Sequence, residues 1–307
     1  MDLEPVPKPL NRCIGRHGEI AELKILLLEE QARLLTLTGP GGIGKTRLAL
    51  ELAEHMSDDM EVSFVSLGPL LPGPPGGGGG LPGQSILGAL GQNLGLADGE
   101  APGFAQRLRQ LCHEPWLCIL DSFEHLLSQA PVLVTLLNQV PSLRLVVTSR
   151  SHLRLSGERI FPIQPLADLA SVELFEERAR AIRPDFQLQP GQQPTLVQIC
   201  RSLEGLPLAL ELAASRLELM SLEEINARLS QKLQLLDAGS QDAAPRHRTL
   251  RATIDWSYEL LEPSDRALFR RLAVFSGGAR LEHIEAELLD IVSRQLLHHL
   301  RRGQRHR

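Results

Sequence analysis

The chain of 307 residues has few of the features that mark secreted, membrane-spanning or metal-binding proteins. Its four cysteines, Cys13, Cys112, Cys118 and Cys200, form no C-x-x-C pair and have no histidine at metal-ligand spacing. We therefore expect reduced and mostly buried thiols, as in a cytoplasmic protein. The sequence opens with no basic and apolar leader, and no uncharged apolar run approaches the roughly 20 residues that span a bilayer. These absences predict neither secretion nor insertion into a membrane.

An excess of basic residues is also missing. The chain has 32 Lys and Arg against 37 Asp and Glu, a formal net charge of −5. Because proteins that bind nucleic acid usually present a basic surface, direct DNA binding by this chain is not indicated. The composition, 43% hydrophobic and 22% charged, is typical of globular proteins, and the length suffices for two or three domains.

Short apolar runs alternate with helical patterns between residues 34 and 165. The runs are almost continuously hydrophobic, which is typical of parallel strands covered on both faces. We therefore predict an α/β fold with a doubly wound parallel sheet, forming a domain over residues 1–166. The predicted strands are residues 34–38, 62–67, 116–120, 143–148 and, more weakly, 159–163, and the predicted helices are residues 45–56, 85–96 and 131–140.

The rest of the chain has a different character. From about Ala167 the strand patterns stop, and four amphipathic helical patterns predict a helical subdomain over residues 167–236. Within the first domain, residues 68–83 are low-complexity Gly and Pro. This segment could cradle a phosphate, but the predicted helix that follows it, residues 85–96, has no lysine at its start. We therefore favour a disordered surface insertion.

Two phosphate-binding patterns overlap in LLTLTGPGGIGKTRLAL, residues 34–50. Three glycines fit the dinucleotide fingerprint G-x-G-x-x-G, and GPGGIGKT fits the P-loop G-x-x-x-x-G-K-[ST]. The dinucleotide site needs an acidic residue at the end of the next strand, but that strand ends in VSLGP. A predicted strand before the loop and a predicted helix after it favour the P-loop. The predicted phosphate-binding residues are Gly39, Pro40, Gly41, Gly42, Ile43, Gly44, Lys45, Thr46 and Arg47.

The P-loop implies a division of roles around a nucleotide and Mg²⁺. Backbone amides and the helix N-terminus would bind the phosphates, Lys45 would reach the β and γ phosphates, and the Thr46 hydroxyl would ligate Mg²⁺. Asp121 ends the strand WLCILD, where a carboxylate can hold the metal through water.

Two charged residues near the ends of these strands have open roles. Glu124 could orient an attacking water, or it could be a solvated glutamate at a helix start. Arg150, after VVTS, could contact a γ-phosphate, or it could be a surface arginine paired with a helix. Ser122 stands where many fast ATPases have a second carboxylate, so we expect slow hydrolysis.

In this order the motifs resemble the NB-ARC-like STAND ATPases (signal-transduction ATPases with numerous domains). More narrowly, they resemble the ATPase portion of large bacterial transcriptional regulators of the LuxR or SARP type. The matching text runs from about residue 11 to residue 280 and reads CIGRHGEI, GPGGIGKTRLA, LCILDSFEHL, LRLVVTSR, EGLPLALELAA and TLRATIDWSYELLEPSDRALFRRLAVFSGG.

The resemblance implies further roles. Ile14, Gly15 and Arg16 match the segment that contacts adenine and ribose, and Pro207 matches a proline that packs on the base. Arg150 matches the sensor arginine and Asp121 the Walker B acid. Residues 249–280 match the start of a winged-helix region, so a partial, truncated one is expected over residues 249–307. Ser122 replaces the usual asparagine.

The favoured hypothesis is a switch module that binds ATP or ADP with Mg²⁺ and is a weak ATPase. The resemblance implies a closed ADP form, opening on exchange for ATP, and a homo-oligomer in the ATP state. One alternative is a DNA-binding protein that uses the partial winged helix, against which the charge argues. The other is a truncated domain that holds ADP without switching.

Overall fold

The computed structural model describes residues 5–68, 70, 85–96, 103–111 and 114–229, together with Arg266 and Arg270. The chain divides into two compact units, Met1–Ile254 and Asp255–Arg307. Every helix and strand discussed below belongs to the first unit. The predicted insertion at residues 68–83 and the predicted winged-helix region at residues 249–307 fall almost wholly outside the described residues.

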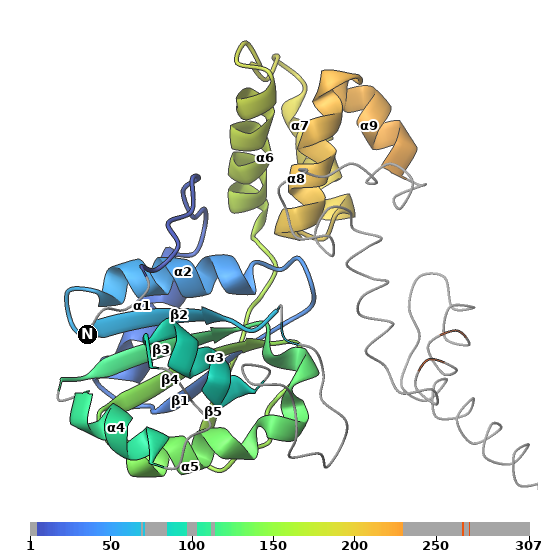
Figure 1. Cartoon of the computed structure of the whole chain (residues 1–307). Helices are drawn as coiled ribbons and strands as arrows, with labels where there is room; N and C mark the ends of the chain where they lie inside the picture. Colours follow the sequence, from blue (N-terminus) through green and yellow to red (C-terminus); the bar gives the residue numbers. More distant parts are fainter. Residues whose placement is uncertain are drawn as a thin grey trace, which may run out of the picture. The chain divides into compact units, whose positions relative to one another are not determined.

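One sheet of five parallel strands organises the amino-terminal half, in the order β2-β3-β4-β1-β5 (Figure 1). All four neighbouring pairs are parallel, so the predicted α/β fold is confirmed. Each strand begins and ends within one residue of its predicted run, and the carboxyl ends of β1, β3 and β4 meet at one edge. The strands are β1 (Leu34–Thr38), β2 (Glu61–Ser66), β3 (Trp116–Asp121), β4 (Leu143–Ser149) and β5 (Glu158–Pro162).

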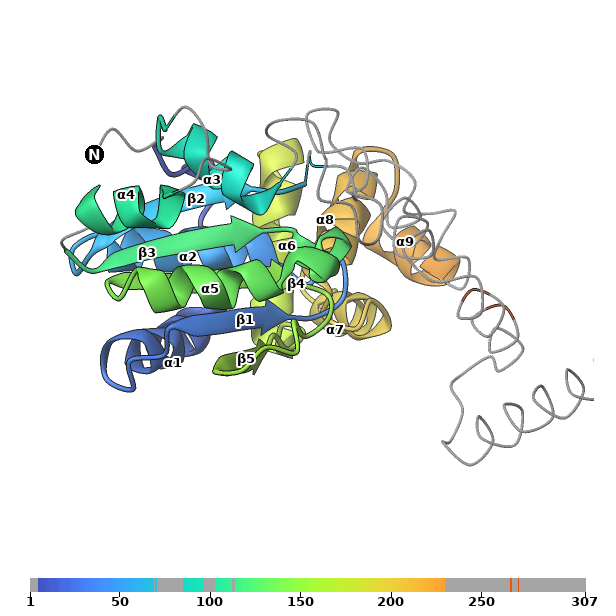
Figure 2. The same ribbon diagram turned by 60° about the horizontal axis from the view of Figure 1, so that its bottom comes forward.

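Helices cover both faces of the sheet (Figure 2). On one face lie α1 (His17–Leu28) and α2 (Lys45–Met56), and on the other lie α3 (Ile86–Asn93), α4 (Phe104–Leu111) and α5 (Pro131–Gln139). Alternate residues of β3 enter the two cores: Trp116 packs with α3 to α5, and Leu117 packs with α1 and α2. Burial on both faces explains why the strands are hydrophobic without alternation.

Two helices of this domain, α1 and α4, were not predicted. In α1 the core stripe is Ile20, Leu23 and Leu27, which has helical spacing. The last four residues of the helix, ILLL, are all apolar, although they point to several sides of the helix, and Ile25 is 44% exposed. An apolar run without a polar face hides the periodicity on which the prediction depends.

A helical subdomain follows β5 in the same compact unit. Its α-helices are α6 (Asp168–Ile182), α7 (Gln193–Ser202), α8 (Pro207–Ser215) and α9 (Leu222–Arg228), and the short 3-10 helix η3 (Arg216–Glu218) follows α8. These are the four predicted helical patterns, although the last pattern extends beyond the described residues. Buried residues such as Phe175, Ile199 and Leu210 form a core of their own.

The cysteines lie mostly where the composition predicts. Cys118 and Cys200 are buried free thiols, Cys13 is a half-buried free thiol, and Cys112 lies outside the described residues. Burial raises the pKa of the Cys200 thiol to about 12, so this side chain stays protonated at neutral pH. Among the helices of the described ranges, none has the length and apolar character needed to cross a bilayer.

Candidate functional site

The turn between β1 and α2 has the backbone of a phosphate-binding loop. Gly42 and Gly44 have φ angles of +80° and +98°, which L side chains rarely adopt. The first hydrogen bond of α2 runs from the Leu48 amide to the Gly44 carbonyl at 2.9 Å. The amides of Lys45 to Arg47 therefore precede the helical ladder and carry the partial positive charge of the helix N-terminus. Such a terminus favours an anion.

Lys45 lies inside this loop. Its Nζ atom donates to the carbonyl oxygens of Gly39 at 2.8 Å and Pro40 at 3.0 Å. Burial lowers the pKa of Lys45 to about 8, and the nearby Glu124 carboxylate opposes that shift. Burial of this ammonium without an anion is costly, and the neighbouring amides have no partners within the helix. A bound polyphosphate would satisfy both groups.

Asp121, at the end of β3, accepts hydrogen bonds from three hydroxyl groups. The Thr46 and Thr148 Oγ1 atoms each lie 2.7 Å from Asp121 Oδ1, and the Ser122 Oγ atom lies 3.1 Å from Oδ2. The carboxylate is only 5% exposed. The two predicted metal ligands, Thr46 and Asp121, are therefore in direct contact. Thr148 was missing from the predicted site, although its place at the end of β4 was a signal for it.

Ser122 has a left-handed backbone conformation, with φ 65° and ψ 54°. Its amide donates to Thr148 Oγ1 at 2.8 Å, and that bond holds the chain in place after β3. Asparagine tolerates this conformation better than serine does. This preference gives a physical reason for the asparagine that is usual at this position in the proteins that the sequence resembles.

Glu124 and Arg150 form an ion pair at the same edge of the sheet. Arg150 Nε and Glu124 Oε1 are 3.4 Å apart, and the side chains are 14% and 8% exposed. Glu124 is therefore not a solvated glutamate, and Arg150 is a half-buried arginine that pairs with a short helix. Glu124 lies in a 3-10 turn, η1 (Phe123–His125), and its Oε2 atom is buried without a hydrogen-bond partner among the described residues.

The amino-terminal motif has a structural role that the sequence did not indicate. Arg16 is 5% exposed and donates to the carbonyl oxygens of Gln164 at 2.8 Å and Ile43 at 3.1 Å. It therefore ties the loop to the segment after β5. Ile14 is buried in the core of the helical subdomain. Between them, Gly15 has φ +69°, and an added Cβ would lie 2.4 Å from Ala170 Cβ.

Pro207 begins α8 at its first position, where a proline needs no hydrogen-bond partner. The next residue, Leu208, donates its amide to the Gly42 carbonyl at 3.2 Å. A Cβ added to Gly42 would lie 2.9 Å from Leu208 Cβ, and one added to Gly44 would lie 3.8 Å from Pro207 Cγ. The start of α8 thus packs directly on the glycines of the loop.

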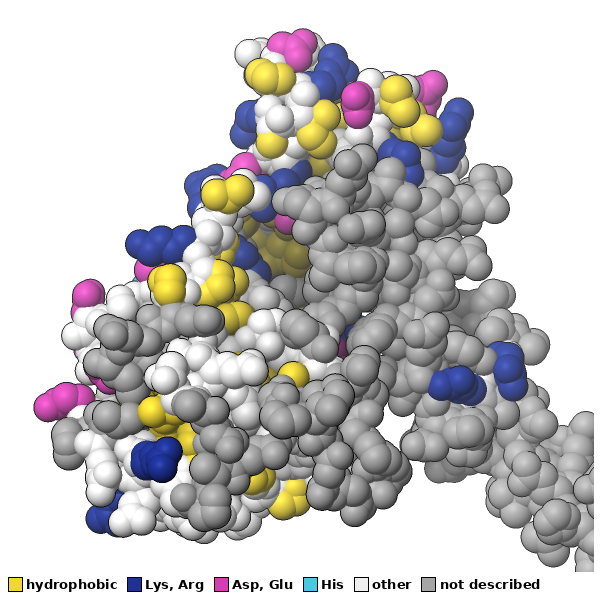
Figure 3. Space-filling model, in the orientation of Figure 1, with side chains coloured by type: hydrophobic (Ala, Val, Ile, Leu, Met, Phe, Trp, Pro, Cys, Tyr) yellow, Lys and Arg dark blue, Asp and Glu magenta, His cyan; other side chains and the backbone are white. Residues whose placement is uncertain are grey.

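These parts surround an open cavity of about 960 Å³ between the loop and the helical subdomain, a size typical of ligand sites. Figure 3 shows a recess here in which hydrophobic and basic side chains lie close together. Four predicted site residues, Gly15, Gly39, Pro40 and Asp121, are not in its lining, but each borders a residue that is. The predicted residues that line it are Ile14, Arg16, Gly41, Gly42, Ile43, Gly44, Lys45, Thr46, Arg47, Glu124, Arg150 and Pro207.

The sequence did not indicate the far wall of the cavity. Arg178 and Glu211, on α6 and α8, contribute to it, as do Arg12 and its neighbours near the amino terminus. In a sequence, charged residues on an amphipathic helix are typical of a solvent-exposed face, so nothing in the pattern distinguished these two. Within the part of the chain that the structure describes, no cluster of three or more His, Cys, Asp or Glu side chains could hold a metal by itself.

Comparison with known proteins finds two kinds of curated relative in Mycobacterium tuberculosis, and no family model matches. The chain is 37% identical over 260 residues to the "Putative HTH-type transcriptional regulator Rv0890c", a match that covers 83% of this chain. It spans only 28% of that relative's length. It is also 34% identical over 295 residues to "Uncharacterized protein Rv0894", which covers 90% of this chain and 69% of the relative.

Three solved structures resemble the chain at low sequence identity. They are a STAND protein with a tetratricopeptide repeat sensor from Pyrococcus horikoshii (TM-score 0.42, 16% identity, 91% of this chain and 37% of that one), C. elegans PCH-2 (0.46, 15%, 71% and 68%), and Drosophila ORC bound to DNA (0.49, 15%, 92% and 86%). At these scores the likeness carries no functional argument.

The curated match is stronger, because 34% identity extends over more than two thirds of the relative's own length. The chain therefore belongs to the same protein family as the uncharacterized protein Rv0894 of Mycobacterium tuberculosis.

Proposed function

We propose that the chain is a nucleotide-dependent switch module that binds ATP or ADP with Mg²⁺, in the manner of the NB-ARC-like STAND ATPases. The observation that carries the proposal is the loop at the start of α2. It combines left-handed glycines, amides outside the helical ladder and a partly desolvated Lys45 in one cavity. These are the groups that a polyphosphate requires.

The residues at the edge of the sheet also fit a magnesium ion. The Thr46 hydroxyl would be a direct ligand, and Asp121 would act through water. Mg²⁺, when bound, would neutralise part of the phosphate charge. The hydrogen bonds of Asp121 support this assignment, because Thr148 and Ser122 hold the carboxylate in place while Thr46 is the group beside the loop.

Slow hydrolysis fits the charges around Glu124. The Glu124 carboxylate acts electrostatically on Lys45, and its Oε2 atom is buried without a hydrogen-bond partner among the described residues, so it is the candidate to orient water. Its other oxygen faces Arg150 at 3.4 Å and is therefore already engaged in an ion pair. Position 122 is serine, so no second carboxylate adjoins Asp121.

The two-sided cavity supports the proposed switch. Phosphate groups would contact the loop, while the start of α8 packs on the same glycines from the helical subdomain. A γ-phosphate would add a contact to Arg150 that ADP lacks, and only such a differential contact can shift a conformational equilibrium. We further propose homo-oligomerisation in the ATP state, which rests on the resemblance to the STAND ATPases alone. We also propose a role in transcriptional regulation, which the name of the relative Rv0890c supports.

Nucleotide should stabilise the purified protein. At about 100 times its dissociation constant, ADP or Mg-ATP is expected to add roughly 2.7 kcal/mol of stability, which raises the melting temperature by several degrees. Thermal denaturation with ADP, Mg-ATP, GTP and a DNA duplex checks this, together with identification of any copurified nucleotide. A shift with the duplex and none with nucleotide would instead support the DNA-binding alternative.

Hydrolysis should depend on Asp121. In single-turnover phosphate release, Asp121→Asn is expected to slow the reaction by at least about tenfold, because an amide holds a hydrated metal less well than a carboxylate does. Nucleotide binding, measured by the melting shift without Mg²⁺, should change little. Equal phosphate release by the two proteins would mean that the chain holds nucleotide without hydrolysing it. That result would favour the alternative of a truncated domain that holds ADP without switching.

A further inference from the structure

The segment Pro9–Ile14, called the strap below, borders the cavity along its whole length. It is anchored at its carboxyl end. Ile14 is buried in the core of the helical subdomain, and Gly15, the next residue, has a left-handed conformation against Ala170. Before the strap, Val6 packs against the core of the sheet domain, whereas the Leu10 side chain is fully exposed. The strap therefore runs between two packed ends, and its exposed middle, Leu10 to Arg12, is held by polar contacts.

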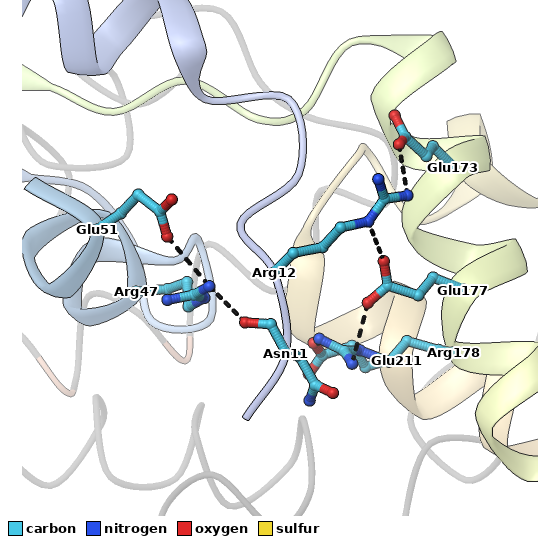
Figure 4. A network of polar contacts seen from close by, with 8 residues as sticks. All are labelled: Asn11, Arg12, Arg47, Glu51, Glu173, Glu177, Arg178 and Glu211. Carbon is cyan, nitrogen blue, oxygen red and sulfur yellow. Dashed lines mark hydrogen bonds and ion pairs between the residues drawn. The ribbon is translucent and has the colours of Figure 1, made fainter. Parts of the chain in front are cut away.

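Those contacts fasten the strap on two sides (Figure 4). On the side of the sheet domain, Arg47 of α2 donates to the Asn11 carbonyl at 2.5 Å and also pairs with Glu51 at 3.1 Å. On the side of the helical subdomain, Arg12 lies between two carboxylates of α6. It is 2.8 Å from Glu173 and 2.6 Å from Glu177.

The second carboxylate links the strap to the far wall of the cavity. Glu177 also lies 3.6 Å from Arg178, whose guanidinium pairs with Glu211 of α8 at 3.0 Å. Arg178 and Glu211 line the cavity, as does Arg12. One line of alternating charges thus runs from the strap across α6 to α8.

The contacts of Arg12 are suited to opening. Arg12 is 64% exposed, Glu173 is 50% exposed and Glu177 is 24% exposed. Exposed ion pairs of this kind change an equilibrium only about two- to fivefold each, and salt screens them. The anchor at Ile14, by contrast, is apolar and insensitive to salt. Release of Arg12 would therefore detach the strap from α6 without disturbing the helical core, and only the bond from Arg47 to the Asn11 carbonyl would still hold its middle.

We propose that the strap is a gate on the nucleotide cavity, latched by Arg12 against Glu173 and Glu177, and that this latch sets the rate of nucleotide exchange. This inference rests on the proposed nucleotide function. Arg12 acts here as a positioning residue, since it holds the strap and needs no contact with the ligand. The chemical signals that would open the gate are raised ionic strength or a partner that supplies competing carboxylates.

Exchange kinetics test the gate. We would follow a fluorescent N-methylanthraniloyl ADP by stopped flow in the wild type, Arg12→Ala and the double variant Glu173→Gln/Glu177→Gln. Both variants are expected to raise association and dissociation rates together, by about three- to tenfold, with little change in the dissociation constant. The wild-type rates should rise between 50 and 500 mM KCl, roughly to those of the variants. Arg180→Ala, which removes another ion pair of α6 (Arg180 with Glu176), is the matched control and should leave the rates unchanged.

A second measurement needs no nucleotide. Cys13 lies in the strap and is half-buried, so the rate at which a maleimide labels it reports strap opening in the free protein. Peptide mass spectrometry separates Cys13 from the other thiols. Arg12→Ala should speed the labelling about three- to tenfold, and Arg180→Ala should not.

Each failure has its own signature. A faster dissociation with an unchanged association rate would overturn the gate, because it would make Arg12 an ordinary ligand contact. Equal Cys13 labelling in the wild type and Arg12→Ala would overturn it whether or not nucleotide binds. If the wild type binds no nucleotide, the proposed function fails, and the gate on nucleotide exchange fails with it. Cys13 labelling would then show only whether Arg12 latches the strap.

Discussion

Gly205→Ala, which adds a single methyl group, should strongly destabilise the folded chain. Gly205 has φ +62°, and an added Cβ would lie 2.3 Å from the carbonyl oxygen of Leu166, which is backbone and cannot rotate away. Leu166 also donates its amide to the Gly205 carbonyl at 3.0 Å, so the two chain segments touch directly. The substitution therefore separates α8 from the linker that follows β5. We expect a loss of about 3 kcal/mol and a melting temperature roughly 6–12 °C lower.

Gly191→Ala is the control for this prediction. Gly191 lies in the same subdomain and also has a positive φ, +93°, but an added Cβ would meet nothing within 4 Å. This variant should lose only the roughly 1 kcal/mol that a left-handed alanine costs. Thermal and urea denaturation of the two proteins give the comparison. If the free energy of unfolding falls equally in both variants, the close contact between Gly205 and Leu166 does not contribute to the stability of the helical subdomain.

Lys45→Ala is expected to remove nucleotide binding while leaving the protein folded. The ammonium is one of the few full charges that can meet a polyphosphate in the loop, and a charge-assisted contact of this kind contributes about 1.5–3 kcal/mol or more. We expect a dissociation constant at least about 100-fold higher and no melting shift with ADP. The ligand-free variant should melt no lower than the wild type, since burial of Lys45 opposes its charge. The control Lys24→Ala removes an ion pair between Lys24 of α1 and Asp59, and this variant should bind nucleotide normally.

Protonation of Lys45 should affect folding stability and ADP affinity in opposite directions. Its pKa of about 8 in the folded chain lies below the ordinary value of 10.5, so between these values the unfolded chain binds more protons. Through this group, stability rises with pH across that window and is flat below it. Phosphate binding needs the proton, so affinity for ADP should fall above about pH 8, by up to about tenfold per pH unit. Titrations at pH 7, 8 and 9 check this, and Lys45→Ala should show neither trend.

The sheet and the loop were predictable because their signals are local. Runs such as LLTLT and LRLVVT are hydrophobic without alternation, and the structure places each of them between two layers of helices. The loop signature is equally local, since a few consecutive residues fix both the turn and the start of α2. The proximity of Thr46 and Asp121 followed from topology, because the carboxyl ends of parallel strands meet at one edge.

The remaining features depend on partners distant in sequence. Glu124 and Arg150 were read separately, and only the register of β3 and β4 brings them to 3.4 Å. Arg12 meets Glu173 and Glu177 across more than 160 positions, a pairing that no periodicity reports. The role of Pro207 is similar: GLPLA is an ordinary helix start by sequence, and its docking on Gly42 and Gly44 appears only in three dimensions. Side-chain pairing between distant elements is a property of the fold and leaves no pattern in a single segment.

The position of β1 in the sheet has a consequence for synthesis of the chain. Among the five strands of this sheet β1 comes first in the sequence, yet it lies between β4 and β5, and Leu34 pairs with Leu145 on one side and Glu158 on the other. When the glycines of the loop leave the ribosome, neither flanking strand exists yet, and both backbone edges of β1 wait for more than a hundred further residues. A nascent chain stalled before Ser149 would thus expose an unpaired hydrophobic strand, the kind of segment that chaperones shield and that aggregates when they do not.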